Sequence, residues 1–213
     1  MTKKERAAKA VALLKEIYPD AVCSLEYNGD KPYELLISTR LSAQCTDARV
    51  NIVAKDLFQK YQSLEDFANA DLGELESIVR PCGFFHTKAK DIIAMCRTLL
   101  DEYNGVLPDT VEELTKLQGV GRKTANLIVG DVYHKPSVVT DTHCIRISGR
   151  LGLTSGTKDP HKVEDELWKI LDPVESGAFC HRLVLFGRDT CMARNPRCGE
   201  CKLRVICKNP VLK

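Results

Sequence analysis

Residues 114–129 read Leu-Thr-Lys-Leu-Gln-Gly-Val-Gly-Arg-Lys-Thr-Ala-Asn-Leu-Ile-Val, which predicts two helices joined by a tight turn. Thr110 followed by Glu113 forms a capping box that starts the first helix. Gly119 can adopt the left-handed conformation that ends it, and Gly121 then opens the second helix. We expect the fold to be organised around this helical pair.

The turn is also a candidate anion-binding site. Backbone amides at the start of a helix bind a phosphate readily, and a glycine turn leaves the approach free of Cβ atoms. Val120 lies between the two glycines, where its side chain can pack between the helices, and the second helix begins with Arg122 and Lys123. Turns of this type are common, however, and a lysine in a first helical turn is most often a solvated charge.

Helical periodicity extends along most of the chain. No stretch alternates with period two for long enough to predict a strand, so we expect an all-α protein. The segment His134-Lys135-Pro136-Ser137 interrupts the pattern and is the predicted domain junction. The predicted helices cover residues 3–18, 33–43, 47–61, 87–103, 141–151, 160–171 and 175–189, together with the pair at 110–133 and two short helices capped by Ser63 and Asp71.

Composition and charge set broad limits. A chain of 213 residues, 44% of them hydrophobic, is long enough for one domain or two small ones. The basic N-terminus is followed by no apolar run, so we expect a cytosolic protein with neither a secretory signal nor a membrane span. Residues 188–213 hold seven Lys and Arg against Asp189 and Glu200, a local charge of +5 in a chain of net +2. This asymmetry is a weak indication of phosphate binding, and a solvated C-terminus explains it equally.

The cysteines fall into two groups. Six are scattered singly, most of them among apolar neighbours, as is typical of buried free thiols: Cys23, Cys45, Cys82, Cys96, Cys144 and Cys180. The other four lie within 17 residues and have the spacing Cys-x6-Cys-x2-Cys-x5-Cys: Cys191, Cys198, Cys201 and Cys207. In a reducing compartment such a group indicates a metal site, and four thiolates hold either a tetrahedral zinc ion or a cubane iron–sulfur cluster.

Two further motifs carry polar side chains next to predicted helices. Asp141, in Val-Thr-Asp-Thr-His (139–143), is a plausible N-cap of the helix that follows. In Ser-Ala-Gln-Cys-Thr-Asp (42–47), Gln44 is most simply a surface amide and Asp47 a helix cap. On residue type alone, none of these side chains requires a chemical role.

Taken together, these motifs resemble the helix-hairpin-helix DNA glycosylases of base excision repair, and the endonuclease III family most closely. The resemblance rests on four motifs in the right order and covers nearly the whole chain. It implies two helical domains that flank a DNA-binding cleft. One is a six-helix barrel that contains the helix-hairpin-helix, at residues 25–135, and the other is an iron–sulfur cluster domain formed by residues 1–24 and 136–213.

The resemblance also implies a mechanism. Lys123 and Asp141 would face each other across the cleft, where Lys123 attacks C1′ of the deoxyribose and Asp141 stabilises the positive charge that develops on the sugar. A Schiff base then links the enzyme to DNA, and β-elimination cuts the strand 3′ to the lesion. The implied partner is double-stranded DNA that holds oxidised pyrimidines or abasic sites.

The remaining implied roles concern the cluster and the DNA. The four grouped cysteines would hold a [4Fe-4S] cluster in preference to zinc, as a staple for a phosphate-binding loop. Gln44 would enter the space that a flipped nucleotide leaves, and Phe84 stands where family members commonly have an aliphatic residue, so that an aromatic ring would wedge between bases. His143 would orient Asp141, contact DNA or pack. The full set of implied DNA contacts is Gln44, Phe84, Gly119, Val120, Gly121, Arg122, His143, Arg194 and Arg197.

Three alternatives stay open at this point. An adenine-mismatch glycosylase shares the cluster but characteristically lacks the lysine and has an acidic residue in the stretch that matches residues 41–47. A non-catalytic DNA-binding scaffold and a redox-sensing iron–sulfur protein need no amine opposite a carboxylate. Lys123 and the stretch Ser-Ala-Gln-Cys-Thr-Asp (42–47) argue against the first, and Lys123 together with Asp141 argues against the other two. We expect a monomeric cytoplasmic enzyme, associated with the nucleoid when bound to DNA.

Overall fold

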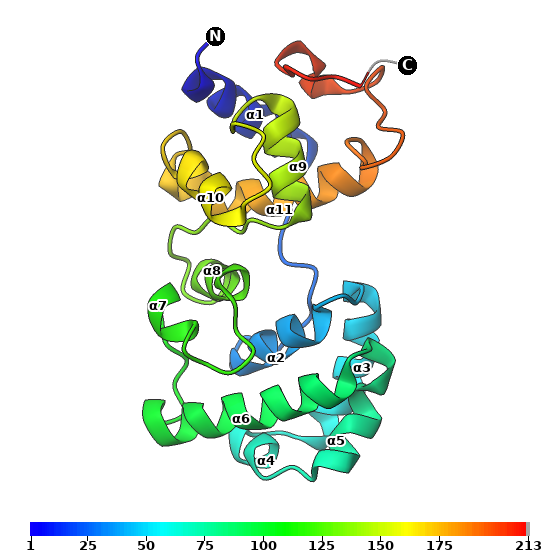
Figure 1. Ribbon diagram of the computed structural model, residues 1–213, viewed down its shortest axis with the longest axis vertical. Helices are drawn as coiled ribbons and strands as arrows, with labels where there is room; N and C mark the ends of the chain where they lie inside the picture. The colour runs from blue at the N-terminus through cyan, green and yellow to red at the C-terminus, as the bar shows by residue number, and fades with distance from the viewer. Residues whose placement is uncertain (212–213) are drawn as a thin grey trace. The chain divides into compact units, whose positions relative to one another are not determined.

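A computed structural model describes residues 1–211 and shows helices without any β-strand in that range, which confirms the all-α prediction (Figure 1). Residues 212–213, the end of the predicted basic segment and of the predicted cluster domain, lie outside the described residues. The elements are α1 (Lys3–Ile17), α2 (Tyr33–Ser42), α3 (Asp47–Lys60), α4 (Leu64–Ala68), α5 (Leu72–Val79), the 3-10 turn η1 (Arg80–Cys82), α6 (Phe85–Tyr103), α7 (Val111–Leu114), α8 (Arg122–Asp131), α9 (Thr142–Leu151), α10 (Pro160–Trp168), α11 (Pro173–Asp189) and η2 (Lys202–Val205). No helix within residues 1–211 is both long and apolar enough to cross a membrane.

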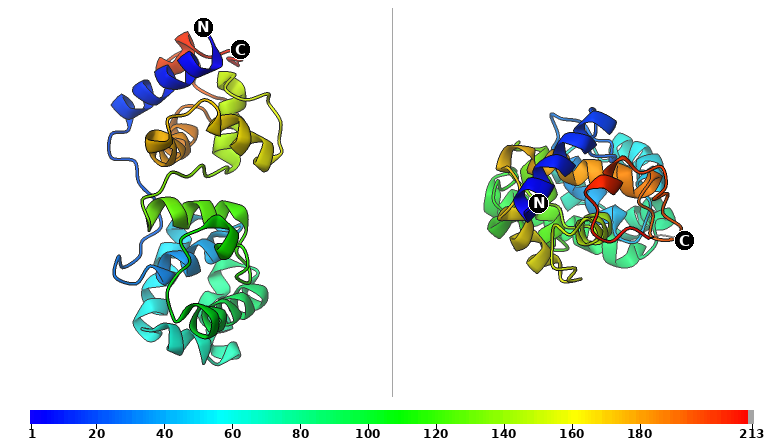
Figure 2. Two further views of the ribbon diagram at one scale, coloured as in Figure 1. Left: turned by 90° about the vertical axis from the view of Figure 1, so that its left-hand side faces the viewer. Right: turned by 90° about the horizontal axis from the view of Figure 1, so that it is seen from above.

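The chain forms two compact units. The first, called the central unit, is Cys23–Tyr133, and the second, called the terminal unit, combines Met1–Val22 with His134–Lys213. The terminal unit therefore joins the two ends of the chain, and α1 packs there against α11 and η2 (Figure 2).

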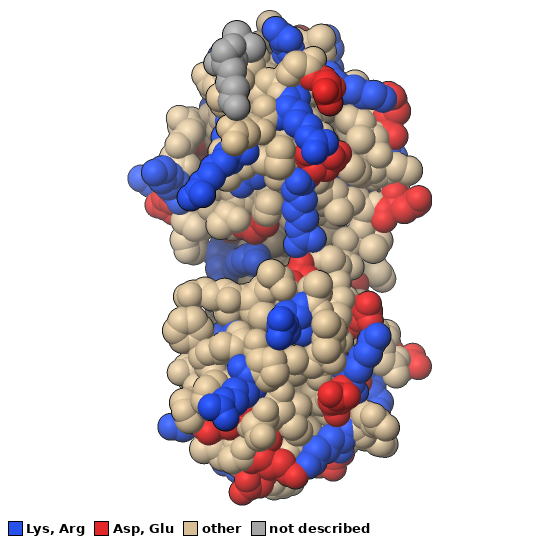
Figure 3. Space-filling view, turned by 90° about the vertical axis from the view of Figure 1, so that its right-hand side faces the viewer, with Lys and Arg blue, Asp and Glu red and all other residues tan. Residues whose placement is uncertain are grey.

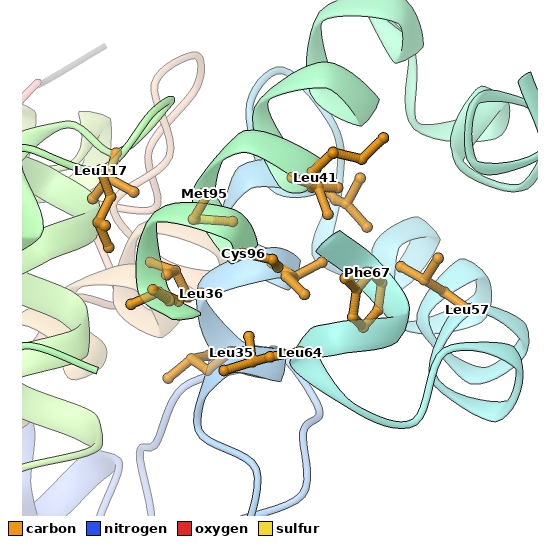
Figure 4. Close-up of a cluster of buried hydrophobic side chains, with 14 of the residues drawn as sticks. Leu35, Leu36, Leu41, Leu57, Leu64, Phe67, Met95, Cys96 and Leu117 are labelled. Carbon is orange, nitrogen blue, oxygen red and sulfur yellow. The ribbon is translucent and has the colours of Figure 1, made fainter. Parts of the chain in front are cut away.

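The central unit is built around α2 and α6. The apolar run Leu35–Ile37 and Leu41 make α2 almost completely buried, as the sequence predicted. α6 places its apolar stripe against α2, α4 and α5, and Phe67 of α4 fills the middle of the core beside Leu57 and Cys96 (Figure 4). This core fixes the two loops and the helical pair from which the candidate site is made.

Most helix ends follow from local capping chemistry. The side chains of Ser63 and Asp71 accept hydrogen bonds from the third amide of α4 and α5, as predicted. The expected cap at Asp47 is wrong, because Thr46 is the N-cap of α3 and accepts from Arg49 N. The carboxylate of Asp47 instead accepts a hydrogen bond of 2.5 Å from Ser24 Oγ.

The first helix of the pair is shorter than the sequence predicts. α7 is a single turn. The chain then continues in 3-10-type turns, with backbone hydrogen bonds from Leu117 N to Leu114 O and from Val120 N to Leu117 O. Thr110 caps Glu113 N, but the Glu113 side chain does not complete the expected capping box. The Glu113 carboxylate is engaged elsewhere, by Tyr103 Oη at 3.0 Å and by Lys116 Nζ at 2.6 Å.

The terminal unit differs from the prediction at one junction. α10 ends at Trp168, because Ile170 N bonds to Leu167 O in a tighter turn. α11 begins at Pro173, two residues before the predicted start, since Asp172 caps it and proline is tolerated in a first helical turn.

Candidate active site and metal centre

The turn between α7 and α8 is shaped by the core beneath it. Val120 is buried and packs with Leu117 and Ala125 in the central core, where the sequence placed it. Gly119 has φ +76°, the left-handed conformation that the prediction required. A Cβ at Gly121 would meet no atom within 4 Å, so the space in front of the start of α8 is open to an approaching group.

A buried ion pair supports the same turn from below. Arg40 of α2 and Asp91 of α6 approach to 2.6 Å, with side chains 16% and 8% exposed. The other oxygen of Asp91 accepts from Gln118 Nε2 at 3.1 Å, which ties the turn to the pair. A Cβ at Gly119 would lie only 2.8 Å from both Arg40 Nε and Asp91 Oδ2, so the turn rests directly on the pair.

Lys123 lies exposed in the first turn of α8, beside the exposed Arg122. The N-cap is Gly121, which has no side chain that could bond to the first amides of the helix. The positive end of the helix dipole and these amides suit an anion, and the lysine adds a mobile positive charge beside it. The start of α8 therefore has the chemistry of a phosphate site with an adjacent amine.

Two exposed loops of the central unit carry the other predicted contacts. Gln44 follows α2 with φ +56°, and Phe84 lies between η1 and α6 with φ +49°. Left-handed backbone is uncommon for residues other than glycine and occurs often at functional sites. Phe84 is 65% exposed although it is aromatic, so its ring is presented to solvent instead of to the core.

Asp141 belongs to the terminal unit and is the N-cap of α9. Its carboxylate accepts a hydrogen bond of 2.7 Å from Cys144 N, which confirms the predicted cap and fixes the orientation of the side chain. His143 is half-buried and lies against α11, where a Cβ at Gly187 would come within 2.2 Å of its Nδ1. Arg146 Nη2 is 3.1 Å from the same nitrogen.

The four grouped cysteines converge on one cavity in the terminal unit. They line it together with Arg150, Phe186 and Leu151, and it contains about 380 Å³ of space outside the atoms, part of it open to solvent. Four thiols around one such space fit a polynuclear iron–sulfur cluster held by Cys191, Cys198, Cys201 and Cys207.

The cysteine pKa values fit the same interpretation. Burial raises the pKa of the Cys201 and Cys207 thiols, and the neighbouring cysteines raise it further. Bringing four thiols together is unfavourable for their ionised forms, and bound metal reverses this because a coordinating thiol is deprotonated.

Three arginines that sequence analysis missed hold the cysteine-containing loop, residues 191–207. Arg150 of α9 donates to Met192 O at 2.7 Å, to Ala193 O at 3.1 Å and to Cys191 Sγ at 3.4 Å. Arg146 donates to Cys191 O at 3.1 Å, and Arg6 of α1 donates to Ile206 O at 3.0 Å. Arg6 is buried, which is rare for an arginine, and its amphipathic position in α1 gave no signal of this contact.

The two arginines of the predicted phosphate-binding loop are both exposed. Arg197 makes a loose ion pair of 3.7 Å with Asp189, and its backbone amide bonds to Thr190 O. On the face drawn in Figure 3, basic and acidic side chains are interspersed over both units. Any phosphate-binding surface on that face must therefore depend on particular side chains and not on a uniform basic field.

Known proteins match the chain along nearly its whole length. Residues 37–173 match the HhH-GPD superfamily of base excision DNA repair proteins, and residues 191–207 match the iron-sulfur binding domain of endonuclease III. Endonuclease III of Synechocystis sp. is 44% identical over 97% of this chain and 93% of its own length, and that of Bacillus subtilis is 40% identical over 91% and 87%. A solved structure of a trapped endonuclease III–DNA covalent intermediate superimposes with a TM-score of 0.92 at 40% identity and covers 99% of this chain and 98% of its own. The chain therefore belongs to the endonuclease III family of HhH-GPD base excision repair proteins, and it is a DNA glycosylase and AP lyase with a [4Fe-4S] cluster.

Proposed function

We propose that this enzyme binds double-stranded DNA and removes oxidised pyrimidines from it, and that it also cuts at abasic sites. Support comes from two solved structures at 40% identity, one of a trapped endonuclease III–DNA covalent intermediate and one of a non-covalent endonuclease III–DNA complex. We further propose that it works as a monomer on chromosomal DNA. A cytoplasmic location is in keeping with ten cysteines of which none forms a disulfide.

Lys123 is the proposed nucleophile. In its neutral form its Nζ attacks C1′ of the deoxyribose, the bond from C1′ to the base breaks, and the base leaves with a proton. Loss of the amine protons and opening of the sugar give a Schiff base between Nζ and C1′. Removal of a proton from C2′ then expels the 3′ phosphate oxygen, which completes β-elimination. The observation that carries this assignment is the exposed Lys123 beside the open turn at Gly121.

Asp141 is the proposed electrostatic partner. Its carboxylate stabilises the cationic sugar as the base departs and assists the proton transfers. The hydrogen bond from Cys144 N orients the carboxylate without supplying a counter-charge. An asparagine in its place would keep the cap but lose the charge.

DNA recognition is assigned to the loops around these groups. A base inside a duplex is out of reach, so the damaged nucleotide is extruded while Gln44 and Phe84 occupy the gap. The amides at the start of α8 bind one phosphate, and Arg194 and Arg197 of the cysteine-containing loop bind others. When bound, the [4Fe-4S] cluster supplies a rigid cross-link for that loop.

Borohydride trapping tests the central assignment. Wild-type enzyme should form a covalent adduct with duplexes that contain one oxidised pyrimidine or one abasic site, and Lys123→Gln should form none. Lys116→Gln is the matched control, since Lys116 is an exposed lysine on the same hairpin. An adduct formed by Lys123→Gln at a near wild-type rate would overturn the assignment.

Asp141→Asn separates the two proposed roles. Release of the damaged base should slow strongly, whereas trapping on a pre-formed abasic site should suffer less, because no base has to leave. The double variant that lacks both Lys123 and Asp141 should lose much less activity than the product of the two single losses, as expected for residues that act as a unit. A panel of duplexes with single defined lesions measures the preference for oxidised pyrimidines, and sedimentation of the free enzyme measures its oligomeric state.

A further inference from the structure

Lys88 is a buried cation that the reaction does not use. It lies in the first turn of α6, and its side chain is among the largest that are fully buried. Its Nζ donates two hydrogen bonds to backbone carbonyls, to Leu41 O at 2.8 Å and to Cys82 O at 2.9 Å. A lysine with no exposed surface and two engaged donors cannot reach a sugar, so it is no rival to Lys123.

The two carbonyls belong to the elements that lead into the exposed loops. Leu41 is in the last turn of α2, three residues before Gln44, and Cys82 ends η1, two residues before Phe84. Carbonyls at the end of a helix lack partners within the helix, and a positive charge there is favoured by the helix dipole. Lys88 satisfies one such carbonyl from each element with the same ammonium group.

The surroundings of Lys88 show that the carbonyls are its main partners. Burial lowers the pKa of Lys88, and the thiols of Cys82 and Cys45 act in the opposite direction. Burial also raises the pKa of the Cys82 thiol to about 11, so at neutral pH that thiol is uncharged. Asp91, one turn further along α6, is already paired with Arg40. Burying a charge that is balanced only by carbonyl dipoles is unfavourable. In this arrangement, however, one ammonium group fixes the distance between two backbone segments.

We propose that Lys88 is a positioning residue for strand opening, which holds the Gln44 loop and the Phe84 loop at the separation needed to fill the gap left by an extruded nucleotide. The inference rests on the proposed function of those two side chains. Lys88 itself touches no DNA and acts through the carbonyls of Leu41 and Cys82. It should therefore matter on duplex DNA, where a gap has to be filled, and not on single-stranded DNA, where there is none.

The test compares Lys88→Met with wild type on one abasic site, placed in a duplex and in the corresponding single strand. Borohydride trapping on the duplex should slow by about tenfold or more, as misplaced groups commonly cause, while trapping on the single strand should stay within about twofold. A 2-aminopurine opposite the site should show a smaller fluorescence increase on binding, because less of it is unstacked. Thermal unfolding confirms that the variant is folded at the assay temperature.

Arg97→Met is the matched control. Arg97 also lies on α6 and donates to one backbone carbonyl, Ala68 O at 2.8 Å, but that carbonyl belongs to α4 and borders neither loop. Its loss should leave the ratio of duplex to single-strand rates unchanged. Lys88→Arg keeps the charge but enlarges the group between the carbonyls, so it should show a smaller duplex-specific defect, and it serves if Lys88→Met does not fold.

Two results would overturn the inference. One is an equal loss on duplex and single strand, which would make Lys88 a structural residue only, and the other is no loss on either substrate. Gln44→Ala and Phe84→Ala distinguish this failure from that of the proposed function. If they show a duplex-specific defect and the Lys88 variants do not, the role of Lys88 alone is wrong, whereas if they show none, the gap-filling proposal fails first.

Discussion

The turn between α7 and α8 and the cysteine-containing loop, the two elements proposed to bind DNA phosphates, are kept in shape by different means. The turn is fixed by side chains of its own unit, with Val120 and Leu117 in the core and Gly119 resting on the pair of Arg40 and Asp91. In residues 191–207 only Leu203 and Ile206 are buried, and arginines from α1 and α9 hold the backbone of the loop by hydrogen bonds. A loop with so little core of its own depends on the cross-link that four cysteines and iron provide.

Removal of a cluster ligand should give the largest effect and separate the two elements most clearly. Cys198→Ser should lose the cluster. Its iron content should fall from about four atoms per chain to none, and the broad absorbance at about 400 nm should disappear. Hydrogen exchange should accelerate in residues 190–209 and stay unchanged in residues 114–125, which belong to the other unit. Cys96→Ala, which alters a buried thiol of the central core, should keep the iron. Unchanged exchange in residues 190–209 would show that the loop holds its own shape.

A methyl group in the turn should produce the next largest effect. Gly119→Ala places a Cβ at φ +76° and within 2.8 Å of Arg40 Nε, so it should destabilise the central unit by about 1–3 kcal/mol in chemical denaturation. Gly121→Ala is its counterpart, because there the Cβ meets no neighbour within 4 Å. It should cost less than about 1 kcal/mol of stability and yet weaken DNA binding, since the methyl group stands where a phosphate approaches. Equal stability losses in the two variants would contradict the support described for Gly119.

Arg150 tests how much the protein itself contributes to the shape of the cysteine-containing loop. Arg150→Met removes hydrogen bonds to two carbonyls and to Cys191 Sγ, and a hydrogen bond with a charged donor contributes about 1.5–3 kcal/mol. The cluster should still assemble, but a chelator or a mild oxidant should strip it several times faster, as followed by absorbance. The stripping rate of Arg150→Lys should lie between those of wild type and Arg150→Met, because an ammonium cannot span both carbonyls as a guanidinium does. A stripping rate equal to wild type would assign the shape of the loop to the cluster alone.

The smallest effects should come from the exposed arginines of the same loop. Arg194→Ala and Arg197→Ala should each weaken binding to damaged and intact duplex alike and lower the slope of affinity against salt by roughly one unit per lost phosphate contact. Lys158→Ala removes an exposed charge of the terminal unit outside the loop and should leave the slope unchanged. A change in lesion preference at constant salt slope would show that these arginines read more than the backbone.

Local chemistry made much of the fold predictable. The all-helical architecture, the left-handed Gly119, the buried Val120 and the caps at Ser63, Asp71 and Asp141 all depend on residues within a few positions of one another. Two of the predictions that failed did so through contacts with other elements. The Glu113 carboxylate accepts a hydrogen bond from Tyr103 instead of completing its capping box. The Asp47 carboxylate accepts one from Ser24, and Thr46 is the N-cap of α3.

Residues of the candidate site could be predicted only where they lie in a recognisable sequence motif. The exposed Lys123 and the grouped cysteines stand in recognisable patterns, whereas Arg40 and Asp91 are 51 residues apart and neither has a sequence signal. Lys88 illustrates the limit. Helical periodicity separates it from the nearby Lys90, because Lys88 shares the apolar face of α6 with Ile92 and Cys96. Periodicity does not specify the two carbonyl partners of its ammonium group, which depend on how α2 and η1 pack against α6.

The joining of the two chain ends in the terminal unit has a consequence for synthesis on the ribosome. Arg6 bonds to Ile206 O across 200 residues, so α1 emerges long before its partners exist. At about 5–20 residues per second, the wait is on the order of 10–40 s. Ala7, Ala10 and Leu14, all fully buried in the folded protein, lack their native partners until α11 and then η2 are made, whereas the central unit is completed within itself. A segment made late in synthesis, η2 and the loop before it, therefore helps to cover α1 and also carries the four cysteines proposed to bind iron.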